Sequence, residues 1–264
     1  MGEDILNGLV VLMYHALWRG ADEREAIDAA DRPYALDEGR FARQLDALRE
    51  HRITVADPAA IARPDRPADG VVLSFDDGHA SNALLALPLL RERGMRAVFF
   101  VTTGFVGTRE GYCSVAQLRE LASQGMEIGG HGHTHRFLSD LPDSDLDEEM
   151  RRSQALLADW LGSPPTQMSF PGGRYDRRVL AACRLHGFQI LHGSVPGSLR
   201  PGPLPAVLPR IAVRAGMHEA DWLAHARGRT ATMLRTQAAH AAKSLARRVL
   251  GNAGYHRLYQ RIKA

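Results

Sequence analysis

Short apolar runs alternate with amphipathic segments along most of this chain, and this alternation is the feature that most constrains its fold. Residues 9–14, 71–75 and 97–101 are apolar runs with the length of buried strands. Segments such as 40–50 and 146–160 instead place apolar residues at helical spacing. Strands and helices in alternation predict parallel strands connected by helices. Roughly seven such units in a chain of this length predict an α/β barrel, complete or distorted.

Length and composition are compatible with one large α/β domain. The chain has 264 residues, of which 45% are hydrophobic and 24% charged, as in an ordinary globular protein with a core. No apolar run approaches the roughly 18 residues of a membrane-spanning helix. Glu3 and Asp4, and no Lys or Arg, precede the first apolar run, so we interpret it as a strand and expect a cytoplasmic protein. Cys113 and Cys183 lack metal-binding spacing and are expected to be core thiols.

The charge is distributed unevenly along the chain. Residues 221–264 contain nine Lys or Arg and one acid, whereas residues 1–220 are mildly acidic. We therefore predict a main domain over residues 1–220 and a basic helical extension over residues 221–264. The extension either packs against the main domain or makes a peripheral contact with an anionic membrane through an apolar face among its bases. Aromatic residues are too few and too scattered to indicate nucleic-acid binding.

Two adjacent acids, Asp76 and Asp77, directly follow the apolar run 71–75. Carboxylates at a strand end are costly to bury unless a cation or several hydrogen-bond donors meet them. At a strand-to-loop turn the two side chains can diverge, one towards a metal and one towards a substrate water, and Gly78 permits the turn. A helix N-cap followed by solvated acids is the alternative.

Three histidines, His131, His133 and His135, follow the predicted strand 126–129. His131 and His135 are four residues apart, which on a helical turn places both on one face, whereas the pairs that include His133 suit an extended strand. Two histidines and one carboxylate with open coordination positions are typical of a catalytic metal centre. The alternative is a polar loop that binds no metal. The presence of both the histidine cluster and the acid pair disfavours this alternative.

These two motifs resemble those of the polysaccharide deacetylase family, which is the NodB-homology domain or carbohydrate esterase family 4. Residues 72–78 are similar to its first motif, residues 127–135 to its second, and residues 11–15 to the first strand of many members. The resemblance covers roughly residues 8–215 and the paired motifs are specific. It implies a distorted (β/α)7 barrel of the polysaccharide deacetylase type, in which residues 1–220 form the catalytic domain.

The resemblance also implies roles for individual residues. Asp76 corresponds to the general base, and Asp77, His131 and His135 correspond to the ligands of a divalent metal, most often zinc, with cobalt, nickel or iron(II) as alternatives. His133 lies between ligand positions and is not expected to bind the metal.

The later motifs match less closely. Residues 170–175 resemble the third motif, and the substrate groove is predicted to include four of them: Pro171, Gly172, Arg174 and Tyr175. Many members have an Arg two residues before the Pro of this motif, where this chain has Ser169. Either Arg174 or Arg210 then supplies the missing charge, or both lie on the surface.

The general acid is less well marked. His192 follows the strand-like run 188–191 and is the candidate by resemblance. His15 also follows a predicted strand and is either a second site residue or a buried core histidine.

We therefore expect a metal-dependent hydrolase that removes N-acetyl groups from amino sugars, with an acetylated polysaccharide, oligosaccharide or glycan precursor as its substrate. One alternative is an O-acetyl esterase acting on a related substrate. The other is a carbohydrate-binding module on a decayed catalytic scaffold, which Ser169 favours and the intact metal motifs oppose.

Overall fold

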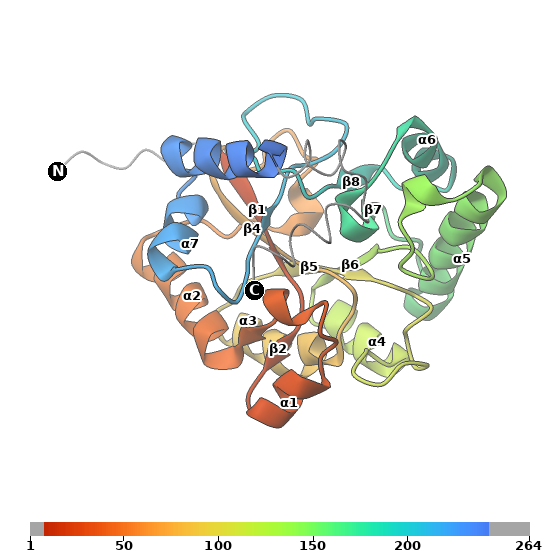
Figure 1. Ribbon diagram of the computed structural model, residues 1–264, viewed down its shortest axis with the longest axis horizontal. Helices are drawn as coiled ribbons and strands as arrows, with labels where there is room; N and C mark the ends of the chain where they lie inside the picture. Colours follow the sequence, from red (N-terminus) through yellow and green to blue (C-terminus); the bar gives the residue numbers. More distant parts are fainter. Residues whose placement is uncertain (1–7, 243–264) are drawn as a thin grey trace.

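The apolar runs form a parallel sheet and the amphipathic segments form helices packed around it (Figure 1). The computed structural model describes residues 8–242. In chain order the strands and α-helices are β1 (Leu9–Tyr14), β2 (Leu17–Trp18), α1 (Ala21–Ala26), β3 (Leu36–Asp37), α2 (Glu38–Glu50), β4 (Gly70–Phe75), α3 (Leu87–Glu92), β5 (Ala97–Val101), α4 (Val115–Ser123), β6 (Glu127–Gly130), α5 (Asp143–Leu161), β7 (Gln167–Ser169), α6 (Arg177–Leu185), β8 (Ile190–His192), β9 (Ile211–Ala212) and α7 (Glu219–Ala226).

Seven strands form one sheet in the order β8-β7-β6-β5-β4-β1-β9, and every neighbouring pair is parallel. Leu208, just before β9, bridges to His192 of β8, while β9 itself pairs with β1. The segment between Leu208 and Ala212 therefore contacts both ends of the curled sheet. This arrangement confirms the predicted α/β fold with a distorted seven-stranded barrel.

Alternate residues of β1 face opposite sides of the sheet, as the period of a strand requires. Leu9 and Val11 pack in a small cluster inside the barrel, whereas Val10 and Leu12 pack in the large core beneath the helices. Because both faces are buried, the strand is apolar throughout.

The helix predicted near residues 84–93 begins differently from expected. Residues Asn82–Ala86 form a π-helix that continues into α3. Pro88 lies in the first turn of α3 and has no N–H to donate, which interrupts the regular α-helical hydrogen-bond ladder.

The first part of the predicted C-terminal extension packs against the barrel. Trp222 of α7 is 2% exposed and donates a hydrogen bond to the hydroxyl of Tyr14 at 3.1 Å. Residues 230–242 are also helical, and Met233 belongs to the same core cluster as Trp222. The apolar face predicted for membrane contact, between residues 245 and 262, lies outside the described residues.

Two smaller expectations concern the described residues 8–242. Cys113 and Cys183 are both buried and free, which confirms their assignment as core thiols. Within this range no helix is long and apolar enough to span a membrane.

Candidate metal centre

The backbone separates the two adjacent acids as soon as β4 ends. The N–H of Asp76 still donates to the carbonyl of Tyr14 at 2.9 Å, as a continuation of the β4–β1 ladder. Asp77 then adopts a left-handed conformation with φ 76°, and Gly78 follows with φ 83°. A Cβ on Gly78 would lie 3.2 Å from Val101, so this tight turn favours glycine for space as well as for backbone angle. The turn sends the two carboxylates in different directions.

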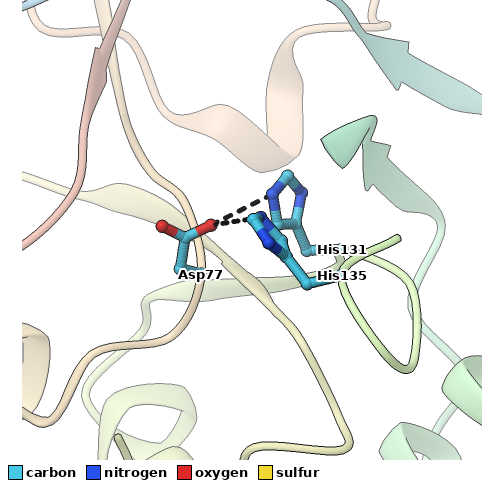
Figure 2. Close-up of side chains that lie close together, drawn as sticks. All are labelled: Asp77, His131 and His135. Atoms are coloured by element: carbon cyan, nitrogen blue, oxygen red, sulfur yellow. Dashed lines mark ion pairs between the residues drawn. The ribbon is translucent and has the colours of Figure 1, made fainter. Parts of the chain in front are cut away.

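Asp77 lies against both predicted histidine ligands (Figure 2). Its Oδ1 is 3.2 Å from Nε2 of His131 and 3.1 Å from Nε2 of His135. The side chains of Asp77 and His131 are 4% and 2% exposed, whereas that of His135 is 34% exposed and borders the opening. The three ligand atoms are close enough together to hold one metal ion.

The hydrogen bonds of His131 test whether a cation fits this group. Nδ1 of His131 lies 2.8 Å from the carbonyl of Ser169, which can only accept, so Nδ1 is the donor. A neutral His131 then presents the lone pair of Nε2 to a carboxylate oxygen of Asp77, and two acceptors face each other. A divalent cation between them satisfies both, and a backbone carbonyl that orients a histidine is usual around metal centres.

The histidine loop is not a helical turn, on which a spacing of four residues would place His131 and His135 on one face. Gly132 and His135 have left-handed backbones with φ 74° and 63°, and the chain folds back on itself between them. The N–H of Gly104 donates to the carbonyl of His133 at 2.8 Å, which ties this loop to the segment after β5. Two reversals of the backbone therefore bring His131 and His135 together.

Glu149, a buried residue of α5, holds the same loop from the other side. Its carboxylate accepts hydrogen bonds from the N–H of His133 at 2.7 Å and of Thr134 at 2.9 Å, and from the Thr134 hydroxyl. His133 itself turns to Thr103, with 2.9 Å between its Nδ1 and the hydroxyl oxygen, and is outside the ligand group. Glu149 was not predicted as a site residue, because its only signal in the sequence is an acid among the apolar positions of an amphipathic helix.

Arg210 supplies the charge that Ser169 lacks. Its guanidinium donates to both oxygens of Asp76 at 2.7 Å, and its side chain is 0% exposed. The Ser169 hydroxyl also lies 3.1 Å from Asp76 and 2.7 Å from Arg210. Burial raises the pKa of Asp76, but the charge and hydrogen bonds of Arg210 outweigh it, and the pKa falls to about 2. Asp76 is therefore an ion throughout the physiological range.

The ligand group and Asp76 line one cavity of about 250 Å³. The other residues around it come from many parts of the chain: Met13, His15, Asp31, Tyr34, Gly172, Ser194, Ala212, Arg214 and His240. His240 belongs to the helical residues 230–242, so the C-terminal extension contributes to the wall of this cavity.

The predicted groove residues of the third motif are dispersed. Gly172 lines the cavity, whereas Pro171 is buried and Tyr175 lines a neighbouring cavity of about 480 Å³. Arg174 lies over the ring of Phe137 and 3.3 Å from Asp140. Of the four residues predicted for the groove, Gly172 is thus the one brought to the metal centre.

His192 is not among the residues that line the cavity. It is fully buried inside the barrel, with its Nε2 2.9 Å from Oε1 of Gln167 and its ring against Phe100. Burial holds the pKa of His192 well below its usual range. The expectation that His192 acts as general acid therefore has no support in the geometry, because the side chain points to Gln167, deeper in the barrel than Ser169.

His15, which the sequence left as either a site residue or a core histidine, lines the cavity. Its ring packs against Tyr34 at 4.8 Å between centroids, and its Nδ1 is buried without a hydrogen-bond partner among the described residues. Burial lowers the pKa of His15, while the charges of Asp77 and Asp76 raise it in part.

Comparison with known proteins identifies the same family as the motifs. Residues 63–191 match the polysaccharide deacetylase family model. The Bacillus subtilis protein YxkH is 26% identical over 214 residues, which cover 79% of this chain and 72% of YxkH. The peptidoglycan-N-acetylglucosamine deacetylase of Bacillus cereus is 27% identical over 120 residues, which are 45% of this chain and only 54% of that protein.

Solved structures show the same fold over most of the chain. IcaB from Ammonifex degensii has 28% identity and a TM-score of 0.70, with 83% of this chain and 96% of that chain covered. The Streptococcus pyogenes deacetylase PplD, solved with acetate, has 22% identity and a TM-score of 0.69, with 82% and 96% covered. The family model covers both the acid pair and the histidine loop of the metal centre. The family model, the relatives and the solved structures thus all support the resemblance of this chain to the polysaccharide deacetylase family.

Proposed function

We propose that this chain is a metal-dependent hydrolase that removes N-acetyl groups from amino sugars of a polysaccharide, oligosaccharide or glycan precursor. The observation that carries the proposal is the convergence of Asp77, His131 and His135 beside Asp76 in one cavity. The Bacillus cereus relative, whose name specifies an N-acetylglucosamine substrate, supports the substrate class.

A divalent cation held by Asp77, His131 and His135 would polarise an acetyl carbonyl and lower the pKa of a bound water. Two imidazoles and one carboxylate suit zinc, and they also accept cobalt, nickel or iron(II). We propose zinc as the resident ion.

Asp76 is the group that we propose takes the proton from the attacking water. A carboxylate has about four lone-pair positions, and Arg210 and Ser169 donate three hydrogen bonds to Asp76. One position on Oδ1 is left to face the cavity. Arg210 keeps the carboxylate ionised and fixed in direction, so Asp76 carries no proton before it takes one from the water.

His15 replaces His192 as the proposed donor to the leaving amine. It lies in the cavity with Asp76 and Asp77, and its buried Nδ1 has no partner among the described residues. Gly172 and Tyr34 line the same cavity, and we propose that they contact the sugar.

The deciding experiment measures metal content and acetate release in the same samples. The wild-type protein is compared with His131→Ala, which removes a ligand, and with His133→Ala, which removes a neighbouring histidine outside the ligand group. We expect one tightly held ion per chain and acetate release from N-acetylglucosamine oligomers in the wild type and in His133→Ala, and neither in His131→Ala.

Two other results have distinct meanings. Metal without acetate release from any N-acetylated sugar, followed by hydrolysis of O-acetylated sugars, would move the reaction to ester substrates. No metal in the wild type after incubation with zinc or cobalt would overturn the proposed function.

A further inference from the structure

We propose that Asp31, Asp77 and His79 form a second divalent-cation site, which shares Asp77 with the first. This inference rests on the first metal site of the proposed function. One ligand atom from each of the three residues lies within 4.8 Å of the others. The set offers two carboxylates and one imidazole, a donor combination that zinc, manganese and iron(II) all accept.

The orientation of Asp77 supports a bridging role. Its Oδ1 faces His131 and His135, while its Oδ2 lies 3.7 Å from Nε2 of His79. The carboxylate thus presents one oxygen to each histidine group. A carboxylate that spans two ions in this way is a common element of two-metal hydrolytic centres, whose ions lie about 3.5–4 Å apart.

His79 has a buried nitrogen that no described residue satisfies. The residue is 5% exposed, and its Nε2 has no hydrogen-bond partner, because Asp77 is beyond hydrogen-bond distance. The ring stacks on Tyr112 with 4.6 Å between centroids, and the His79 carbonyl accepts from the N–H of Asn82 at 3.0 Å. The imidazole is therefore held in place with an unpaired nitrogen towards Asp77. An unpaired buried polar atom is costly, and a cation there would remove the cost.

Asp31 brings a second negative charge to the same place. It lies in the turn before Tyr34 and lines the catalytic cavity with Asp77. No Lys or Arg within residues 8–242 forms an ion pair with it. Two carboxylates this close repel each other unless a proton or a cation lies between them. Because Asp77 divides its charge between two ions, we expect the second ion to bind more weakly than the first.

A second ion would be accessible from the cavity that Asp31 and Asp77 line. There the ion would be held by Asp31 and would take an oxygen of the sugar or of the acetyl group. The function of the site is thus to bind substrate oxygen beside the first ion.

The test is a titration of the full-length protein with Mn²⁺ after its metal has been removed with a chelator. Equilibrium dialysis with metal analysis gives the number of bound ions, and electron paramagnetic resonance shows whether they are coupled. We expect two ions per chain in the wild type, with magnetic coupling that appears as the second ion binds. Asp31→Asn should bind one ion per chain, with a mononuclear spectrum and an unchanged first affinity. Asp28→Asn, which changes an exposed acid of the same segment that pairs with Arg109, should retain two.

His79→Phe provides an independent variant, because it keeps a ring against Tyr112 and removes the nitrogen. We expect it to lose the second ion as well, with an unchanged circular dichroism spectrum. Saturation of the wild type at one ion per chain, or equal behaviour of Asp31→Asn and Asp28→Asn, would overturn the second site and leave the proposed deacetylase intact. Failure of the proposed function would instead show as a wild type that binds no ion.

Discussion

At the scale of the residue, the pairing of Asp76 with Arg210 couples the chemistry of the site to its stability. Asp76 is buried, and a buried carboxylate without a partner would be protonated or would destabilise the fold. Arg210 reverses this effect and lowers the pKa of Asp76 to about 2. The folded-state pKa is therefore below the usual value of about 3.9. The stability that this pair contributes is present above that usual value and is lost as the pH falls towards 2.

Arg210→Met should consequently reverse the pH dependence that Asp76 contributes. Without the guanidinium, burial raises the pKa of Asp76, so the variant loses stability as the pH rises above about 4, where the wild type has gained it. We expect a deficit of about 3–5 kcal/mol near pH 7. Urea unfolding between pH 3 and 7 measures it, with Arg63→Met, at an exposed arginine, as a control expected within about 0.5 kcal/mol of the wild type. A deficit that does not change with pH would contradict this account of Asp76.

The two candidate proton donors can be separated by their kinetics. His15→Ala should lower kcat by about 10²–10⁴-fold, the usual contribution of a general acid, and leave the tight metal ion in place. His192→Gln removes a histidine that bonds to Gln167 inside the barrel, so its main effect should be on unfolding and not on the pH profile of kcat. Acetate release at several pH values, together with metal analysis, distinguishes the two. Loss of the basic limb of the profile in His192→Gln alone would restore His192 as the acid.

At the scale of the element, α5 holds the histidine loop through one side chain. Glu149 accepts three hydrogen bonds from the loop. The loop carries two ligands, and its backbone reverses at Gly132 and His135. A loop of this shape relies on outside partners, because its own residues do not form a regular ladder of hydrogen bonds.

Glu149→Ala should therefore weaken metal binding by about 10–100-fold, as the loss of an outer partner of a metal site usually does, because the loop that carries His131 and His135 loses its contact with α5. The variant leaves the N–H groups of His133 and Thr134 without their acceptor. Glu148→Ala is the matched control, because Glu148 is exposed and pairs with Arg151 on the helix surface. Competition with a chromophoric zinc chelator measures both affinities. Equal affinities in the two variants would show that the loop is ordered without α5.

At the scale of the whole molecule, residues 221–242 of the C-terminal extension are part of the fold and of the cavity. Trp222 lies in the core cluster with the strands, and His240 lines the cavity of the metal centre. We propose that residues 1–220 form a catalytic domain that needs the following helices to complete its core. Within residues 221–242, a change in charge pattern along the sequence therefore does not mark the start of an independent unit.

Trp222→Ala tests this dependence. It removes a fully packed indole and its hydrogen bond to Tyr14, and we expect it to destabilise the protein by about 3–5 kcal/mol. Leu234→Ala, at a side chain that is 59% exposed, is the control, with an expected change below about 1 kcal/mol. Thermal unfolding followed by circular dichroism gives both values. A Trp222→Ala protein as stable as the control would mean that the barrel folds without α7.

The local pattern of the sequence predicted the main strands and helices and indicated the proposed metal ligands. Apolar runs of strand length located β1, β4 and β5, and the motifs after β4 and β6 supplied Asp77, His131 and His135. Parallel strands end at the same edge of a sheet, so residues that follow them meet there whatever the details of the loops. This is why Asp77, His131 and His135, the proposed ligands, lie together although His131 and His135 are not on a helical turn.

The tertiary structure alone decided which side chains surround those ligands. Arg210 reaches Asp76 because the segment from Leu208 to Ala212 contacts both ends of the curled sheet, and no local signal indicates such a contact. Strand alternation predicts which face His192 and Ser169 share, but not how deep in the barrel each side chain points. That depth depends on the register and curl of strands far apart in the sequence, and it placed His15 at the cavity and His192 in the interior.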